Sequence, residues 1–474
     1  MTTRRQFLQA SSAGLVGLAM TSSNAKSNDY LSQPQAKVPH SMGADSPDAQ
    51  LWAKEGKPIK AALIGCGWYG KSDLFRLIQC GGEKVEVAAL CDVDAQRLTE
   101  AGTLVAQRQA SGATPRLYKD YRDLLSKETL DVCLVGTPDH WHALPMIAAC
   151  EAGCDVYVQK PISVDVVEAK AMLNAARKHN RVVQVGMQRR STPILCDAKK
   201  KYFDSGEIGK VAMVNVFDTY SRGVSKLQPE PVPPELDYEM WVGPAPMRPF
   251  FNMHQVRRWR AYMEYGNGTI GDMGVHMFDM ARWLLNLRWP SKIVSAGGIY
   301  VQKDGDQTYF DTQKSLFFYD DLVMEWSHKH WSEPTDPRIG WGAEIFGECG
   351  TFKGGSMAYD WKPRGKGVTQ VDSVLEYEAY PSDATEPGLE RRNAGANRAH
   401  MWNFLARTVD RQRPVSDIEE GYISTACCIL ANISTELGGE VLEFDPDACV
   451  VKGNDKATDK LRRPYRAPWK HPEI

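Results

Sequence analysis

Residues 59–70 read IKAALIGCGWYG. The first six are mostly apolar, which is typical of a short buried strand, and a helical stretch follows the last glycine. Each glycine has a physical role in such a strand–turn–helix unit. Gly65 permits the tight turn, Gly67 lets the backbone approach a pyrophosphate, and Gly70 lets helix and strand pack closely. Because a helix N-terminus attracts phosphate, this stretch predicts a dinucleotide-binding unit.

A second apolar stretch, Val85 to Cys91, ends in an acid at Asp92. This is the expected position of the carboxylate that accepts the adenosine ribose hydroxyls. An acid there would repel the 2′-phosphate of NADP, so the sequence favours NAD. The alternative is that Asp92 and Asp94 cap the helix that starts near Ala95, and both roles are compatible.

The alternation of strands and helices continues after this unit. Apolar strands are expected at 131–135, 155–158 and 182–185, with helices at about 143–152 and 164–179. This pattern predicts a doubly wound parallel Rossmann sheet over residues 58–190. Loops at the carboxyl ends of its strands are expected to line the cofactor cleft, namely 137–142, 159–161 and 186–190.

Four blocks of sequence resemble the glucose-fructose oxidoreductase / inositol dehydrogenase family: GCGWYG at 65–70, TPDHWHA at 137–143, VYVQKPIS at 156–163 and GDMGVHMFD at 271–279. The resemblance implies that Lys160 lies beside the nicotinamide and the reacting hydroxyl, and that Asp272 and His276 complete the catalytic site. It also implies the following cofactor contacts: Gly65, Gly67, Trp68, Tyr69, Gly70, Asp92, Thr137, Pro138, His142, Lys160 and Gln188.

Oxidation of a secondary alcohol needs a base for the hydroxyl proton and a group that holds the oxygen. We assign His276 as the base, Lys160 as proton relay and alkoxide stabiliser, and Asp272 as the group that orients the hydroxyl or the lysine. A spacing of four places Asp272 and His276 on one helix face. The alternative is a solvated loop lysine beside a helix-capping and core pair.

One residue departs from the family pattern. The usual glutamate before the catalytic lysine is Gln159 in this chain. A neutral neighbour stabilises the ammonium less than a carboxylate would, so the proton role of Lys160 is less secure. His140 and His142 have no recognisable third ligand, so no metal site is predicted.

The second half of the chain has alternating strands at 211–220, 292–301, 313–319 and 322–328. Helices are expected at about 192–205, 269–285, 397–410 and 418–437. We predict an α+β substrate domain over 191–440, with an open, mainly antiparallel sheet, and a C-terminal tail at 441–474. The resemblance implies that the late helices brace the first domain and that the exposed sheet face joins copies of the chain into a dimer or tetramer.

A carbohydrate substrate follows from the resemblance, and stacking side chains are available for it. The segment HQVRRWRAYMEY at 254–265 combines aromatic and arginine residues, which suit a sugar ring and its hydroxyl or acid groups. The candidate substrate contacts are Trp141, Arg189, Trp259, Arg260 and Tyr262, with Arg257 as an alternative to the other arginines.

The N-terminal residues resemble a twin-arginine export signal. Arg4-Arg5 precedes an apolar stretch at 13–20 and the small residues 23–25, so residues 1–25 are predicted to direct export, with 26–57 as a polar arm. The alternative is a short amphipathic helix. The eleven cysteines show no paired ladder and favour buried free thiols, consistent with folding before export.

Export restricts the mechanism, because free NAD is scarce outside the cytoplasm. The sequence therefore predicts an NAD that stays bound and is recycled in place. The net reaction is either an oxidation coupled to a reduction or a redox-neutral cleavage or epimerisation through a transient keto-sugar. A non-catalytic sugar-binding protein on the same fold is a further alternative. A formal net charge of −2 points to neither a nucleic acid nor a membrane anchor as partner.

Overall fold

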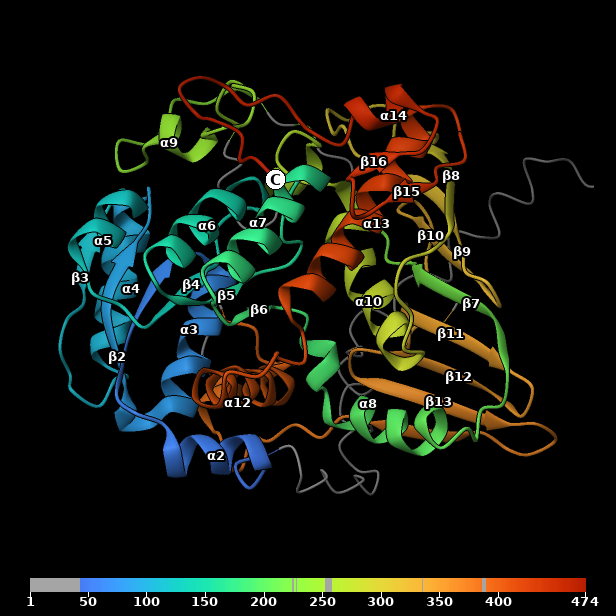
Figure 1. The fold of residues 1–474 in the computed structure, drawn as a ribbon, viewed down its shortest axis with the longest axis horizontal. Helices are drawn as coiled ribbons and strands as arrows, with labels where there is room; N and C mark the ends of the chain where they lie inside the picture. Colours follow the sequence, from blue (N-terminus) through green and yellow to red (C-terminus); the bar gives the residue numbers. More distant parts are fainter. Residues whose placement is uncertain (1–42, 224–225, 227, 252–257, 335, 386–388) are drawn as a thin grey trace, which may run out of the picture. The chain divides into compact units, whose positions relative to one another are not determined.

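The computed structural model describes residues 43–474 except 224–225, 227, 252–257, 335 and 386–388. The predicted export signal, most of the predicted arm and Arg257 therefore lie outside the described residues. Two sheets organise the described part of the chain (Figure 1). Among the described helices, none combines the length and the apolar character that crossing a bilayer requires.

The first sheet has six parallel strands in the order β3-β2-β1-β4-β5-β6, which confirms the predicted Rossmann arrangement. Its strands are β1 (Ile59–Ile64), β2 (Val85–Cys91), β3 (Arg116–Tyr118), β4 (Val132–Val135), β5 (Asp155–Val158) and β6 (Val183–Val185). The connecting helices are α3 (Trp68–Gly81), α4 (Ala95–Ala106), α5 (Tyr121–Lys127), α6 (Ala143–Glu151) and α7 (Val166–Lys178). The β4 and β5 strands are entirely buried, which is typical of the inner strands of a parallel sheet that is covered on both faces.

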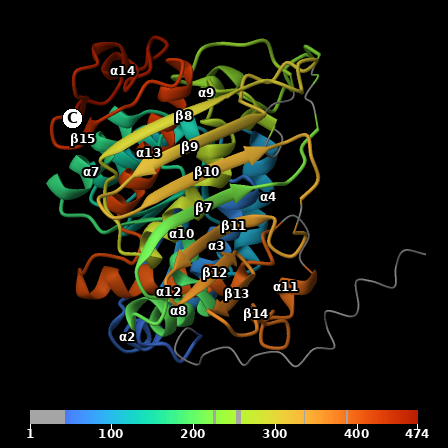
Figure 2. The same cartoon turned by 90° about the vertical axis from the view of Figure 1, so that its right-hand side faces the viewer.

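The second sheet has eight strands in the order β14-β13-β12-β11-β7-β10-β9-β8, and only the β7–β10 pair is parallel. This confirms the mainly antiparallel sheet. Figure 2 shows the sheet in front of its helices, and α10 (Val275–Leu284) and α13 (Ile418–Glu436) pack against it. Its strands are β7 (Val211–Asp218), β8 (Lys292–Gly298), β9 (Thr312–Phe318), β10 (Val323–Lys329), β11 (Trp341–Gly347), β12 (Gly350–Gly355), β13 (Ala358–Pro363) and β14 (Thr369–Asp372).

The end of the predicted polar arm is helical. Helix α2 (Pro47–Glu55) begins with Ser46, whose side chain accepts a hydrogen bond from the backbone N–H of Ala49. It packs on α12 (Ala394–Asp410), and Trp52 is buried. A capping serine followed by a proline is a favourable helix start, so residues 47–55 are not an extended arm. Helix α12 also packs on α3 of the first domain.

Two of the predicted helices contain wider, π-helical turns. Helix α8 (Pro193–Ala198) continues into a π-helical turn at Lys199–Asp204. A second π-helical turn, Ile270–Gly274, precedes α10, and the N–H of Val275 bonds to the carbonyl of Ile270. Asp272 therefore lies in a π-helical turn and His276 in the α-helix that follows.

Residues 441–474, the predicted C-terminal tail, contain regular structure. They contain β15 (Phe444–Asp445), β16 (Val450–Val451) and α14 (Asp455–Asp459). The chain then returns to the first domain, where the carbonyl of Leu461 accepts hydrogen bonds from the N–H groups of Val166 and Val167. The remaining helices are α9 (Tyr238–Val242) and α11 (Ser382–Thr385).

All eleven cysteines lie in the described part of the chain, and none of them is in a disulfide. Nine are buried, which matches the predicted free thiols that pack as small apolar groups.

Candidate active site

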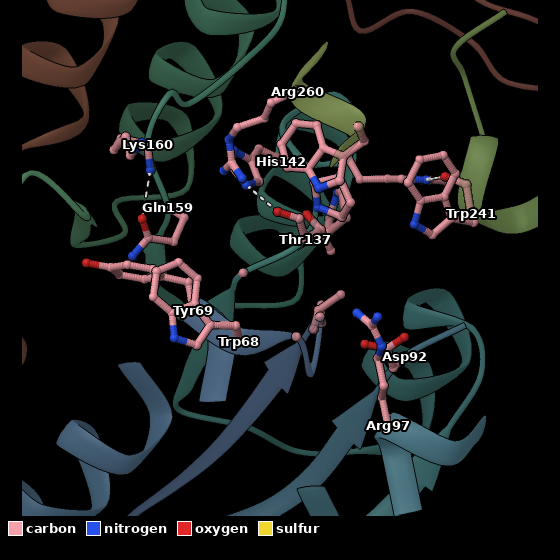
Figure 3. A pocket seen from close by; sticks show the side chains of 18 of the residues that line it. Trp68, Tyr69, Asp92, Arg97, Thr137, His142, Gln159, Lys160, Trp241 and Arg260 are labelled. Carbon is pink, nitrogen blue, oxygen red and sulfur yellow. Dashed lines mark hydrogen bonds between the residues drawn. The ribbon is translucent and has the colours of Figure 1, made fainter. Parts of the chain in front are cut away.

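A cleft runs along the carboxyl ends of the first sheet to the start of α10. Figure 3 shows Asp92 and Arg97 at one end of the cleft, with Lys160 and Gln159 on the opposite side. The cleft therefore joins the turn that is expected to bind a dinucleotide to the residues that are expected to act on the substrate.

The glycine turn has the geometry that pyrophosphate binding requires. Gly65 has a φ of 96°, and a Cβ there would lie 2.6 Å from the backbone N of Thr137. A Cβ on Gly70 would lie 2.0 Å from the carbonyl oxygen of Gly65, so only glycine fits. At Gly67, which precedes α3, a Cβ would meet no atom within 4 Å. The helix N-terminus is therefore open toward the cleft, as a bound phosphate needs.

Asp92 and Asp94 have separate roles. The Asp92 carboxylate accepts hydrogen bonds from the backbone N–H groups of Cys66 (2.6 Å) and Asp94 (2.9 Å), which ties the end of β2 to the glycine turn. Asp94 caps α4 through the N–H groups of Gln96 and Arg97. Burial raises the pKa of Asp92. Asp92 lines the cleft, so its carboxylate is placed to accept ribose hydroxyls, while capping belongs to Asp94.

A segment of the second domain covers the Asp92 end of the cleft. We call residues 235–245 the strap. Its backbone joins the first domain through two hydrogen bonds, from Ala95 N to Glu235 O and from Asp237 N to Val93 O, both 3.0 Å long. Met240 and Trp241 of the strap line the cleft. Sequence reasoning missed these contacts.

Trp141, a predicted substrate contact, lies beneath the strap. Its indole N–H is 3.0 Å from the carbonyl oxygen of Met240 and 2.9 Å from that of Trp241. Gly243 of the strap, at a φ of 54°, leaves no room for a Cβ, which would lie 2.1 Å from the Trp141 ring. Trp141 thus lines the cleft as the support of the strap.

Residues near the C-terminus hold the strap in place. The backbone N–H of Arg466 donates to Pro244 O at 2.8 Å, and its side chain donates to Gly243 O at 3.1 Å and pairs with Glu239. The Trp469 ring packs edge-on against Trp141, with the ring centroids 4.7 Å apart. The end of the cleft near Asp92 is therefore covered by two layers of chain.

His142 joins two of the loops that line the cleft. Its Nδ1 lies 2.6 Å from Pro161 O and its Nε2 lies 2.9 Å from Thr137 O. Burial lowers the pKa of His142 to about 4, so the ring is neutral and donates a hydrogen bond to only one of these two carbonyls. His142, Thr137 and Pro138 all line the cleft, as predicted for cofactor contacts.

Lys160 and Asp272 form a buried ion pair across the cleft. The Lys160 ammonium donates to the Asp272 carboxylate and to its backbone carbonyl, both at 2.8 Å. Burial, and then the nearby Arg260 cation, lower the pKa of Lys160, while Asp272 opposes this change. Burial alone would raise the pKa of Asp272, but Lys160 and Arg260 hold it well below its ordinary value. The pair is therefore ionised.

His276 lies one turn beyond Asp272 and lines the same cleft. Its ring packs edge-on against Trp341, with centroids 5.5 Å apart. The buried Nδ1 atom has no hydrogen-bond partner among the described residues. Burial and the cations Lys160 and Arg189 hold the pKa of His276 well below its ordinary value. The unpartnered nitrogen can accept a hydrogen bond from a ligand, whereas the lowered pKa makes the imidazole a weaker base than a free histidine.

Some predicted contacts do not line the cleft. Tyr262, a predicted substrate contact, is buried in an aromatic cluster, and its hydroxyl donates to Asp306 at 3.0 Å, so its ring does not line the cleft. Gln188 lies behind the lining residue Tyr69 and donates to its hydroxyl at 2.7 Å. Gly70 acts within the turn. Trp259 and Arg260 do line the cleft, and the Arg260 guanidinium stacks on the Trp259 ring at 4.1 Å.

Arg189 lines the cleft. Four residues that the sequence did not single out lie near Arg189 or near Arg260. Trp341, Glu390 and Asn393 come from distant segments, and no local motif marks them. Asp139 lies within the TPDHWHA block, which was the available signal. Burial raises the pKa of Asp139 to about 7, and Arg260 lies 3.5 Å from its carboxylate.

Comparison with known proteins agrees with this geometry. Residues 59–187 match an oxidoreductase family with an NAD-binding Rossmann fold, and residues 200–316 match the C-terminal alpha/beta domain of an oxidoreductase family. The two matched families are both of the Gfo/Idh/MocA type, and the two matches together cover more than half of the chain.

Two curated relatives have similar sequences. Inositol 2-dehydrogenase of Salmonella typhimurium is 31% identical over 158 residues, which is 33% of this chain and 45% of that protein. Levoglucosan dehydrogenase of Pseudarthrobacter phenanthrenivorans is 30% identical over 167 residues, which is 35% of this chain and 36% of that protein. The matches thus span about half of the relatives' length or less.

Solved structures share the fold over most of the chain. An inositol dehydrogenase homologue from Azotobacter vinelandii, complexed with NADH and myo-inositol, has a TM-score of 0.60 and 18% identity, covering 82% of this chain and 98% of that one. Levoglucosan dehydrogenase with NADH and levoglucosan has a TM-score of 0.61 and 18% identity, covering 80% and 97%. With its Rossmann sheet, glycine turn and second sheet, the chain belongs to the NAD-binding Gfo/Idh/MocA oxidoreductase family.

Proposed function

We propose that the protein is an exported NAD-dependent oxidoreductase that acts on a secondary hydroxyl group of a sugar, polyol or glycoside and keeps its NAD bound between turnovers. The hydride taken from this substrate is then returned in place to the carbonyl group of a second compound, which regenerates NAD. The observation that carries the activity is the meeting of Lys160, Asp272 and His276 in one cleft with a turn that fits a dinucleotide. NAD, when bound, supplies the hydride acceptor. Gly67, the α3 N-terminus and Asp92 are the residues placed to hold it.

The chain's own groups divide the proton chemistry. Neutral His276 accepts the proton of the substrate hydroxyl through an imidazole nitrogen. The Lys160 ammonium donates a hydrogen bond to the hydroxyl oxygen and stabilises its developing negative charge. Asp272 fixes the ammonium through the 2.8 Å contact and keeps it charged. The buried surroundings exclude water, which strengthens these interactions.

A retained cofactor is supported by the strap and by the residues that hold it. Trp241 and Trp141 line the end of the cleft at which Asp92 is placed to bind adenosine, and Trp469, which is not a lining residue, packs on Trp141. The same enclosure suits the second candidate function, which is a redox-neutral cleavage or epimerisation. Both the cleavage and the epimerisation proceed with NAD that stays bound.

The activity is tested with the purified, cofactor-loaded protein. Bound NAD(H) is quantified after denaturation, and reduction of bound NAD is followed by absorbance after each sugar, polyol or glycoside is added. The Lys160→Ala variant is expected to bind sugar but to transfer no hydride. If the wild type binds sugars but no compound reduces its NAD and no glycoside is converted, the result would instead favour a non-catalytic sugar-binding protein. Continuous NADH release from added NAD would contradict retention.

Export and self-association are parts of the proposal. Residues 2–8 and the absence of disulfides among the eleven described cysteines support folding before twin-arginine export. Fractionation of cells that express the wild type or the Arg4→Lys/Arg5→Lys variant tests it, since only the wild type should leave the cytoplasm. Light scattering tests the dimer or tetramer that is proposed through the second sheet.

A further inference from the structure

The side chain of Arg189 is a buried cation with no ionic partner close to it in the described part of the chain. It lies in the 3₁₀ turn Gln188–Ser191 after β6, is 2% exposed and lines the cleft. One terminal nitrogen donates to the side-chain oxygen of Asn393 at 2.8 Å. The buried Nε has no hydrogen-bond partner among the described residues. No carboxylate of those residues lies within 4.0 Å of the guanidinium, and Glu390 acts on it only from farther away.

The neighbouring Arg190 shows what an ordinary buried arginine looks like in this protein. Its Nε and one terminal nitrogen bond to the two oxygens of Asp279, both at 2.8 Å, and it also pairs with Glu420. Burial lowers the pKa of Arg189, whereas these carboxylates raise that of Arg190. A buried charge without a partner is costly, so an unpaired guanidinium in a binding cleft indicates that a ligand completes it.

Arg189 lies next to the catalytic groups. Its guanidinium packs on the Trp341 ring at 5.4 Å, and the same ring contacts the imidazole of His276. The other buried cations of this region already have carboxylates: Lys160 and Arg260 share Asp272, and Arg260 also faces Asp139. Among the described residues, the Arg189 guanidinium thus has no carboxylate within 4.0 Å, and the Trp341 ring contacts both it and His276.

We propose that the substrate is a sugar acid whose carboxylate binds Arg189 while His276 and Lys160 act on a hydroxyl group of the same ring. This rests on the proposed function. Because Asn393 occupies one terminal nitrogen, the Nε edge remains available. Two parallel N–H groups on that edge match the two oxygens of a carboxylate. One unpaired cation also matches a monoanion better than it matches a phosphate dianion.

The test compares compounds that differ only in the charged group. Methyl glycosides of glucuronate, galacturonate and mannuronate are titrated into the NAD-loaded protein, each beside its neutral uronamide and its parent hexoside. Binding is measured by tryptophan fluorescence and calorimetry, and NAD reduction is measured in the same samples. Wild-type protein should bind at least one acid about 100-fold more tightly than its amide, because an unpaired buried partner is costly.

Variants assign this preference to one side chain. Arg189→Met should bind acid and amide equally, and Arg189→Lys should keep part of the preference. Arg413→Met removes an exposed arginine outside the cleft and serves as the matched control. Equal binding of every acid and its amide by the wild type, or an acid preference that persists in Arg189→Met, overturns the proposal. If acids bind selectively through Arg189 and no NAD is reduced, the sugar-acid site stands and the oxidoreductase proposal fails.

Discussion

The amide of Gln159 donates a hydrogen bond to the carboxylate of Asp73, with 2.5 Å between Nε2 and Oδ2. Asp73 is buried on α3, and Gln159 precedes the catalytic Lys160. The amide oxygen of Gln159 accepts a hydrogen bond from the backbone N–H of Lys160, with 3.3 Å between the oxygen and the nitrogen. A Cβ on Gly186 would lie 2.6 Å from the Gln159 amide, so the amide is also confined by packing. Asp73 on the glycine-turn helix thus supplies an acid group next to Gln159, and burial raises the pKa of Asp73 to about 8.

Exchanging the two groups should preserve the pair. Gln159→Glu alone places two carboxylates at hydrogen-bond distance, which cannot both be ionised, and should lower kcat by about tenfold. The double variant Asp73→Asn/Gln159→Glu restores one acid and one amide and should recover most of that loss. Single-turnover NAD reduction across pH measures the effect. If the double variant loses as much activity as the losses of the two single variants added together, the two residues act separately.

Removing the catalytic groups should abolish chemistry and leave the cofactor in place. His276→Ala and Lys160→Met should each reduce hydride transfer by at least about 100-fold, because each takes away a proton-transfer or oxyanion-stabilising group. The NAD content of the purified variants, measured after denaturation, should match that of the wild type. Loss of NAD together with activity would instead indicate that these side chains hold the cofactor.

Loosening the strap should release NAD faster. Trp469→Ala removes the ring that packs on Trp141, so dissociation of NAD into excess unlabelled NAD should accelerate about tenfold or more. The matched control is Trp331→Ala, since Trp331 is exposed and lies outside the cleft. Release at the wild-type rate from Trp469→Ala would remove the structural basis for cofactor retention.

His400 should make stability fall in acid. Its ring nitrogens contact Ser191 and the carbonyl of Val185, and burial lowers its pKa to about 4. Between about pH 4 and pH 6.5 the unfolded chain therefore binds a proton at His400 that the folded protein does not. As the pH falls from about 6.5 towards 4, the free energy of unfolding decreases by about 3 kcal/mol. The stability advantage of wild type over His400→Gln, measured by urea unfolding, should shrink across this range. A constant difference would contradict the assignment.

The first domain and the catalytic groups were predictable because their signals are local. An apolar run ending in Gly65 identifies β1 and its turn, and the blocks around Lys160 and Asp272 have recognisable spacing. Strands β11 to β14 were missed because glycines and charged residues interrupt their alternation. Their pairing is decided by neighbours in the sheet, which a local pattern does not record.

The errors at the site also have physical reasons. Tyr262 and Trp259 lie three residues apart in one aromatic and basic segment, and only tertiary packing sends Tyr262 into the core and Trp259 to the cleft. The contact of Trp141 with Trp241 joins residues that are 100 positions apart. Such contacts arise when the domains pack, so no local pattern in the sequence could have revealed the strap.

The π-helical turn at Ile270–Gly274 has a consequence for engineering and evolution. It holds one residue more than an α-helical turn, since Val275 bonds five positions back. Deleting that extra residue would give a more regular helix and would turn the residues before the deletion by roughly 100° relative to α10. Selection for thermal stability alone therefore favours a helix in which the residues of this turn leave their present positions in the cleft. Library designs that reward stability should leave these five positions unchanged.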